Sequence, residues 1–265
     1  MSLSILEDGF LSVFKNFVDW WRFYLEIVNA LGIDREMDEF ATQIAFSYVG
    51  GVNPPIILLN SLIIGRETIV FGAGPNLVKH ISILDSKHVI DEHVLVAADG
   101  ATKALVEVGV VPHIIVTDLD GDLESIKYSH HHGSILAIHV HGDNIPVFIE
   151  FLNEVRRCLN NVIVTTQVKP AYPILNFGGF TDGDRAYLLT LFFKPSKIIL
   201  AGMDFGNVVG RYSKPWLVRD EAASPRKRIK LNIAYKIVGY ISCQTSVPTY
   251  TLSDIRPGCV RKAEL

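Results

Sequence analysis

Six short apolar runs, separated by stretches with helical periodicity, constrain the fold of this chain more than any other feature. Each run is apolar throughout, which is typical of strands covered on both faces. Strands that alternate with helices form parallel sheets with right-handed crossovers. We therefore predict an α/β fold, a Rossmann-like three-layer α/β/α sandwich with a mostly parallel sheet. The strands are expected at residues 68–71, 94–97, 114–116, 135–138, 162–164 and 198–200, and the helices between them at 75–83, 101–108, from 122, 148–155 and 182–193.

The two flanks of this core have different patterns. Residues 4–31 carry many aromatic and aliphatic side chains at helical spacing, and a second helix is expected from Asp34 to Gly50. Beyond the last predicted strand the chain becomes basic and irregular, until Ser224 and the following proline open a further helix. The tail after Cys243 could add an edge strand or cover the site. We divide the chain into an N-terminal helical segment (1–65), a Rossmann-like core (66–206) and a C-terminal extension (207–265).

Composition narrows the class of protein. With 49% hydrophobic and 20% charged residues, the chain has the profile of a compact globular protein. The net charge of -3 provides no overall basic field for nucleic acid. No apolar run reaches the ~20 residues of a membrane span, and the acidic residues soon after Met1 do not fit a signal peptide. We expect a soluble protein with no nucleic-acid and no membrane partner.

The three cysteines bear on the compartment. Cys158, Cys243 and Cys259 are odd in number and widely separated, without the paired spacing of a zinc site or a disulfide framework. We therefore expect neither, and we expect a reducing, cytoplasmic setting.

Polar or glycine residues follow every predicted strand directly. In open parallel sheets, ligands bind beyond the carboxyl ends of the strands, because loops and helix N-termini converge there. We expect the loops after the six strands to cluster on this edge and to form the site. They lie at residues 72–76, 99–100, 117–121, 139–144, 165–167 and 202–204.

Aspartates in these loops predict a metal site. Asp118 and Asp120 stand on alternate residues at a strand end, so both can reach one divalent cation, and Mg²⁺ prefers such oxygen ligands beside phosphates. Asp99 and Asp143 on neighbouring loops would add negative charge that is unfavourable without cations. The alternative is that each aspartate caps the next helix, as Asp122 is expected to do. We predict Asp99, Asp118, Asp120 and Asp143 as catalytic residues, with Asp118, Asp120 and Asp143 as metal ligands.

The loop after the first strand could bind phosphate. Gly72 and Gly74 would let a phosphate approach the main chain at a helix N-terminus. A dinucleotide fingerprint is not satisfied, because Leu77 replaces a third glycine and Pro75 lacks an amide hydrogen. A tight turn without a ligand is the alternative. The predicted nucleotide-binding residues are Gly72, Gly74, Pro75, Asn76, Gly100, Asp182, Arg185 and Asp204.

Two further segments leave alternatives open. The glycine-rich loop 176–185 is long enough to fold over a ligand, although Asp182 could simply cap the helix that follows. Histidines 130–132 are expected in a solvated loop, because adjacent residues seldom point at one metal ion. His139 and His141 alternate at a strand end and share a face, which makes them plausible site residues.

Taken in order, these motifs resemble the archaeal-type 6-hydroxymethyl-7,8-dihydropterin pyrophosphokinases and, more distantly, the thiamin pyrophosphokinases. The resemblance covers roughly residues 66–206. At Thr117 and Gly121 the chain departs from the thiamin pattern, which has glycine and serine there, and this weighs against thiamin as the acceptor. The motifs are FGAGPN at 71–76, ADGAT at 98–102, PHIIVTDLD at 112–120, HVHGDN at 139–144, residues 176–185 and ILAGMDFG at 199–206.

The resemblance implies an activity and its cofactors. It implies Mg²⁺-dependent transfer of diphosphate from ATP, the co-substrate, to 6-hydroxymethyl-7,8-dihydropterin, which gives AMP and a pterin diphosphate for tetrahydromethanopterin-type or folate-type pterin biosynthesis. By similarity, the four predicted aspartates bind magnesium and the nucleotide phosphates. Arg185, Lys227 and Arg228 are candidates to neutralise phosphate oxygens, with a solvated helix face as the alternative for Lys227 and Arg228.

Two other functions and one assembly remain open. A sugar-nucleotide-dependent glycosyltransferase could use the same Asp-x-Asp pair to hold a metal and a diphosphate. A non-catalytic nucleotide-binding module would bind ATP without consuming it, but binding alone seldom needs so many acids. The apolar N-terminal helices could cover the core of their own chain or pack against a second subunit in a homodimer.

Overall fold

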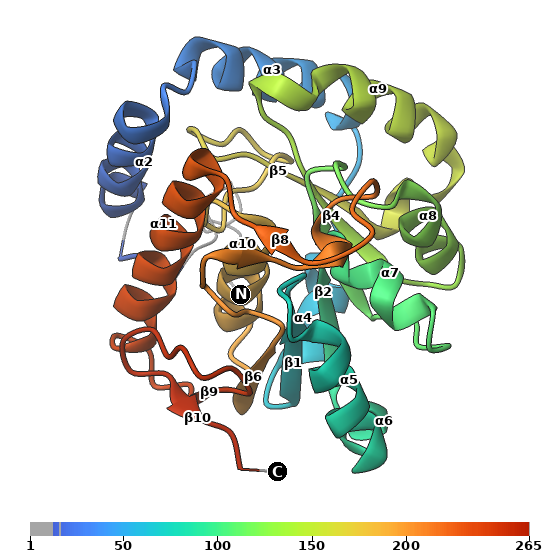
Figure 1. Cartoon of the computed structure of the whole chain (residues 1–265). Helices are drawn as coiled ribbons and strands as arrows, with labels where there is room; N and C mark the ends of the chain where they lie inside the picture. Colours follow the sequence, from blue (N-terminus) through green and yellow to red (C-terminus); the bar gives the residue numbers. More distant parts are fainter. Residues whose placement is uncertain (1–12, 16, 265) are drawn as a thin grey trace.

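The structure, a computed structural model, describes residues 13–15 and 17–264. Within these residues an eight-stranded sheet forms the centre of the molecule, in the order β10-β9-β6-β1-β2-β3-β4-β5 (Figure 1). Its neighbouring strands pair in parallel throughout. The strands are β1 Glu67–Phe71, β2 Val94–Ala98, β3 Ile114–Thr117, β4 Ile135–His139, β5 Val162–Thr165, β6 Lys197–Ala201, β9 Thr249–Thr251 and β10 Arg261–Lys262. The six predicted strands are confirmed, and the tail after Cys243 adds β9 beside β6 and the edge strand β10 beyond it.

The predicted helices are present, but the first begins at Phe17, after bends at residues 13–15, and the helices Ile56–Ile63 and Val89–Glu92 were not predicted. The second helix follows Asp34, whose side chain caps it by accepting a hydrogen bond from the Met37 amide at 3.2 Å, and ends at Gly50 as expected. The helices are α2 Phe17–Leu31, α3 Arg35–Val49, α4 Ile56–Ile63, α5 Leu77–Ser86, α6 Val89–Glu92, α7 Ala101–Val106, α8 Leu123–His131, α9 Ile145–Glu154, α10 Asp182–Phe192 and α11 Pro225–Ser242. Short 3-10 helices are η1 Gly142–Asn144, η2 Arg156–Asn161 and η3 Arg211–Ser213, and β7 Val208–Val209 pairs with β8 Glu221–Ala222 in a small antiparallel hairpin.

Helices cover both faces of the sheet, so the predicted three-layer α/β/α sandwich is confirmed (Figure 1). Alternate residues of β2 show how the layers form. Val94 and Val96 join a core with α2, α4, α10 and α11, whereas Leu95 and Ala97 join a core with α5, α6 and α7. Helices α3, α8 and α9 extend the second face over β3, β4 and β5. Burial on both sides explains why these strands are apolar throughout.

The N-terminal helices pack on their own chain. Trp20 and Tyr24 of α2 are fully buried in the core that α10 and α11 share, and the indole of Trp20 donates a hydrogen bond to the Gln167 carbonyl at 2.8 Å. Of the two alternatives for this apolar surface, covering the core of the same chain is therefore shown for α2. Residues 4–12 and 16 of the first predicted helix lie outside the described residues. A homodimer and the boundaries at 65 and 206 stay predictions.

The prediction from the cysteines was wrong. Cys243 and Cys259 form a disulfide that joins the end of α11 to the loop before β10. Their Cα atoms come within 5.0 Å because the tail folds back along α11, where Gly239 and Gly258 are in backbone contact. A separation of 16 positions along the chain gave no sign of this approach, since tertiary packing of the tail decides it. The spacing of the cysteines therefore does not indicate a reducing compartment.

The histidine run also differs from the prediction. His130 and His131 form the last turn of α8 rather than a loop, and His130 is buried with its Nδ1 atom 3.1 Å from the Ser134 carbonyl. His131 and His132 are exposed, as expected. Separately, none of the helices in the described part of the chain is long and apolar enough to span a bilayer.

Candidate active site

A cavity of about 320 Å³ lies beyond the carboxyl ends of β1, β2, β3 and β6. The structure thus brings four of the predicted loops to one edge of the sheet, where parallel strands place their ligand sites. Asn76, Asp143 and Arg185 are not among the residues that line the cavity. The predicted site residues that do line it are Gly72, Gly74, Pro75, Asp99, Gly100, Asp118, Asp120, Asp182 and Asp204.

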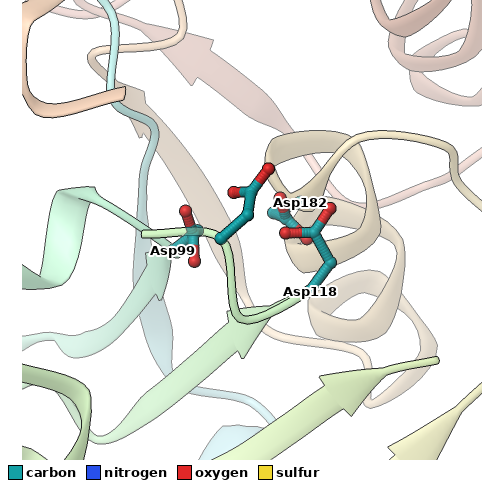
Figure 2. A group of neighbouring side chains, drawn as sticks. Asp99, Asp118 and Asp182 are labelled. Atoms are coloured by element: carbon teal, nitrogen blue, oxygen red, sulfur yellow. The ribbon is translucent and has the colours of Figure 1, made fainter. Parts of the chain in front are cut away.

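Four carboxylates converge in this cavity, and we refer to them as the acidic group: Asp99, Asp118, Asp120 and Asp182. One oxygen from each lies within 4.8 Å of the others. Figure 2 shows Asp99 after β2, Asp118 after β3 and Asp182 at the start of α10, with their carboxylates turned towards one another. A group of oxygen ligands this close can hold a hard divalent cation.

Asp143 does not belong to the acidic group. It lies in η1 with an exposed side chain, and its neighbour Asn144 points inward instead. The Asn144 amide donates hydrogen bonds to the carbonyls of Asp118 at 2.8 Å and His139 at 2.7 Å. The tight turn of η1 therefore directs the side-chain amide of Asn144 towards the site and the carboxylate of Asp143 towards solvent. Asp182, which the sequence indicated as a nucleotide-binding residue, completes the group.

Burial and like charge dominate the electrostatics of the acidic group. Burial, reinforced by the carboxylates of Asp182 and Asp118, raises the pKa of Asp99 well above its usual range. Burial and the Asp118 carboxylate also raise the pKa of Asp182 to about 8. Burial opposes ionisation of Asp118 as well, but His141, with Nε2 3.7 Å from the carboxylate, and Arg185 lower its pKa on balance. These opposed shifts indicate a group that needs a counter-ion.

The backbone turns sharply at the strand ends that carry these aspartates. Asp99, Leu119 and Phe205 have left-handed φ angles of 45°, 67° and 50°, which residues other than glycine seldom adopt. Leu119, which stands between Asp118 and Asp120 in the sequence, is buried in the core, while both aspartates line the cavity. Thr117 holds this turn: its hydroxyl donates to Asp99 at 2.6 Å and accepts from the Leu119 amide at 2.8 Å. Thr117 therefore positions the acidic group.

Packing requires a glycine in the loop after β1, which the sequence did not reveal. A Cβ atom at Gly74 would lie 2.5 Å from both the Gly202 carbonyl and the Asp204 carboxylate, so this loop and the turn after β6 need a glycine to meet. Asp204 accepts hydrogen bonds from the Asn76 amide at 2.9 Å and side chain at 3.0 Å, and from the Ser253 hydroxyl. Asn76 and Asp204 thus clasp two loops together, a structural contact that the prediction of nucleotide binding did not include.

Arg185 braces the acidic group from behind. Its guanidinium lies 3.4 Å from Asp182 and donates to the Gln167 side chain at 3.1 Å. Gln167 in turn donates to Asp38 of α3 at 2.7 Å, and Asp38 also accepts from the Tyr24 hydroxyl at 2.7 Å. The sequence did not indicate Asp38, and it indicated Gln167 only as a loop residue, because no local pattern shows that these side chains meet buried partners.

The C-terminal extension supplies the opposite side of the cavity, which we call the basic wall: Lys214, Arg226, Lys227 and Lys230. The Lys214 ammonium contacts the Asp120 carboxylate, and Lys230 lies over the Phe180 ring, 5.6 Å from its centre. Lys227 was a candidate from the sequence, whereas Lys214, Arg226 and Lys230 were missed as site residues. The candidate Arg228 is not among the residues that line the cavity. The only available signal was the basic composition of residues 207–230.

The donor set of the acidic group fits a divalent cation. Oδ1 of Asp118 is buried and has no hydrogen-bond partner among the described residues. An unpaired buried carboxylate oxygen is costly unless something satisfies it. Carboxylate oxygens at this spacing suit Mg²⁺ better than metals that prefer nitrogen or sulfur.

The family model and the similar curated proteins indicate the same family. A family model described as "6-hydroxymethylpterin diphosphokinase MptE-like" matches residues 50–210. Proteins named 6-hydroxymethyl-7,8-dihydropterin pyrophosphokinase are similar over most of the chain. The one from Methanocaldococcus jannaschii is 39% identical over 232 residues, with 84% of this chain and 94% of that protein covered. Those from Methanothermobacter thermautotrophicus and Pyrococcus furiosus are 40% and 36% identical, each with 84% of this chain and 93% of the relative covered.

A solved structure shares the fold. The MAf glycosyltransferase from Magnetospirillum magneticum AMB-1 superposes with a TM-score of 0.52 at 14% sequence identity. The match covers 88% of this chain but only 39% of the glycosyltransferase chain. At this identity the likeness supports the α/β architecture and carries no argument about the reaction.

Proposed function

Because this chain belongs to the MptE-like 6-hydroxymethylpterin diphosphokinase family, we propose that it transfers a diphosphoryl group from ATP to the hydroxymethyl oxygen of 6-hydroxymethyl-7,8-dihydropterin. The products would be AMP and the pterin diphosphate, a step of pterin biosynthesis. The observation that carries the proposal is the acidic group, whose four carboxylates face a basic wall across one cavity. A polyphosphate chain with its metal ion requires both kinds of surface.

We assign the metal site to Asp118, Asp120 and Asp182. These residues would hold Mg²⁺, which supplies positive charge to phosphate oxygens as negative charge develops on them. The unpartnered Oδ1 atom of Asp118 supports this assignment. Asp143 is not included, because its side chain is exposed outside the acidic group.

The reaction requires in-line displacement at the β-phosphorus of ATP. The acceptor oxygen forms a bond to that phosphorus, the bond to the oxygen bridging to the α-phosphate breaks, and AMP leaves with the electron pair. Most of the rate enhancement would come from holding the two substrates in this geometry. Lys227 and Lys230 line the cavity and would neutralise phosphate oxygens there.

The hydroxyl proton of the acceptor needs a base. We assign this role to Asp99, because its carboxylate lines the cavity beside the three carboxylates assigned to the metal. Thr117 fixes one oxygen of Asp99 through a 2.6 Å hydrogen bond, and this leaves the other free to accept a proton. The other three carboxylates would remain with the metal.

An assay that separates AMP from ADP tests the proposal. Purified protein is incubated with ATP, Mg²⁺ and 6-hydroxymethyl-7,8-dihydropterin, and the same reaction is run with Asp118→Asn and with thiamin as the acceptor. We expect AMP only when the pterin is present, none with thiamin, and loss of AMP in the variant. Formation of ADP, or unconsumed ATP, would contradict the proposal, and sugar nucleotides would then be tested as donors.

A further inference from the structure

A lysine already occupies part of the acidic group. The Lys214 ammonium contacts Oδ2 of Asp120, and its side chain is about three-quarters buried, with 24% exposed. Lys214 also lines the cavity, so its charge faces the same space as the phosphates would. Another lysine close to this edge, Lys103, pairs at 3.2 Å with Asp122, which caps α8 and is not in the acidic group. The two ion pairs therefore differ in what they neutralise.

The segment that carries Lys214 is held firmly over the sheet edge. This covering segment, residues 207–223, includes η3 and the β7–β8 hairpin. The Tyr212 carbonyl lies so close to Gly100 that a Cβ atom there would be 1.8 Å from its oxygen. The Tyr212 hydroxyl also contacts Glu107 at the far end of α7. Lys214, two residues further on, is therefore delivered to the acidic group by a segment anchored at both ends of α7.

The contact creates a competition at Asp120. The same carboxylate oxygen cannot be the close partner of an ammonium group and a ligand of a divalent cation at once, because the two positive charges would repel at contact distance. If Asp120 takes up a metal ion through Oδ2, the ammonium must leave that oxygen. The anchored covering segment keeps it inside the cavity, where the phosphates would be the next available anions.

We propose that Lys214 is a catalytic residue that neutralises Asp120 before Mg²⁺ arrives and then contacts the oxygens of the transferred diphosphoryl group. This inference rests on the proposed function, because it takes the acidic group to be the metal site. Lys214 keeps its protons throughout. It stabilises negative charge on the β-phosphoryl oxygens while the acceptor oxygen bonds to phosphorus and the bridging oxygen departs with AMP.

The two roles predict opposite effects of one substitution. Lys214→Met removes the competing charge, so Mn²⁺, used as a probe for Mg²⁺, should bind the nucleotide-free protein about 5-fold tighter or more. The same variant should lose roughly 10²-fold in kcat, because a cation at the transferred phosphate is missing. If Lys214 merely held the covering segment in place, Lys214→Met would weaken metal binding or leave it unchanged.

Mn²⁺ binding measured by electron paramagnetic resonance, together with AMP formation, tests this. Lys103→Met is the matched control and should change neither Mn²⁺ affinity nor turnover, while Lys214→Arg should keep the wild-type Mn²⁺ affinity. Lys214→Gln replaces the methionine variant if that protein does not fold. Equal or weaker Mn²⁺ binding in the neutral variants overturns the inference and leaves the proposed function standing. No saturable binding in wild type or in either neutral variant overturns the metal site on which both rest.

Discussion

The two sides of the cavity were assembled in different ways. The acidic group belongs to a wall in which Asp99, Asp118 and Asp120 each follow a strand within three residues. The basic wall comes from the C-terminal extension, and its members are far in sequence from the loops that they face. Either side alone would be unfavourable, since buried like charges repel and half-buried lysines lose hydration. Facing each other, they suit a ligand that carries both metal and phosphate.

The difference shows where substitutions should act. The turns at the strand ends around the acidic group are held by local geometry: left-handed residues occur in them, and the Asn76–Asp204 hydrogen bonds join the loops after β1 and β6. The basic wall depends on contacts such as that of Tyr212 with Gly100. Changes to the acidic group should therefore abolish the reaction. Changes at the contact between the covering segment and the sheet edge should instead misplace Lys214 and lower the rate.

The largest expected effect separates two aspartates that the sequence analysis ranked the other way, with Asp143 as a metal ligand and Asp182 as a nucleotide-binding residue. Asp182→Asn removes a member of the acidic group, and we expect kcat/KM for AMP formation to fall by roughly 10²-fold or more. Asp143→Asn changes an exposed side chain outside the group and should cost less than about threefold. Steady-state kinetics on the two variants checks this. If Asp143→Asn were the more damaging, the composition of the acidic group would be wrong.

The contact between the two walls can be broken at Gly100. In Gly100→Ala the added Cβ would overlap the Tyr212 carbonyl, so the covering segment must shift. We expect a cost of about 1–3 kcal/mol in the free energy of unfolding, and turnover lower by about tenfold as Lys214 moves away.

Gly51→Ala is the matched control for this experiment. A Cβ atom there meets nothing within 4 Å, so its unfolding free energy should stay within about 0.5 kcal/mol of wild type. Urea unfolding and AMP formation would be measured for both variants. Wild-type values for Gly100→Ala would show that the covering segment does not rest on this glycine.

Metal binding should stabilise the folded protein by relieving repulsion within the acidic group. At Mg²⁺ concentrations about 100 times the dissociation constant, binding adds about 2.7 kcal/mol of stability, or a rise in Tm of roughly 5–10 °C for a chain of this size. Asp182→Asn should lose most of this rise. Thermal unfolding with Mg²⁺ and with EDTA decides the matter, and an equal rise in both proteins would place the metal elsewhere.

The smallest predicted effect concerns the pH dependence of folding stability, through a buried histidine that contacts the turn after β6. Nδ1 of His80 accepts a hydrogen bond from the Gly202 amide at 2.9 Å, and burial lowers the pKa of His80, against an opposing effect of Asp204. As pH falls below about 6.5, the unfolded chain gains a proton that the folded protein resists. Folding stability is therefore lost on acidification, by at most about 1.4 kcal/mol per pH unit from this residue.

His80→Asn isolates that contribution, because its amide oxygen can accept the same hydrogen bond without titrating. Urea unfolding at pH 7.5 and 5.5 should show a smaller loss of stability in the variant than in wild type, by up to about 1 kcal/mol. His132→Asn, at an exposed position, should behave as wild type does. Identical pH dependence in all three proteins would mean that the pKa of His80 does not differ between the folded and unfolded states.

The sequence by itself determined the architecture and one side of the site. Strand and helix positions follow from local periodicity, and the rule that ligands bind beyond parallel strand ends located Asp99, Asp118 and Asp120 on one edge. These features are short in range: each depends on a few neighbouring residues and on the direction of one strand.

Tertiary structure alone decided the rest. The choice of Asp182 over Asp143 depends on which way a single turn of η1 faces, and the periodicity of the sequence does not contain that orientation. The disulfide and the basic wall depend on how the C-terminal extension folds back over the sheet edge. Contacts between residues so distant in sequence are set by packing of the whole core, because no local preference fixes the path of a chain across a surface.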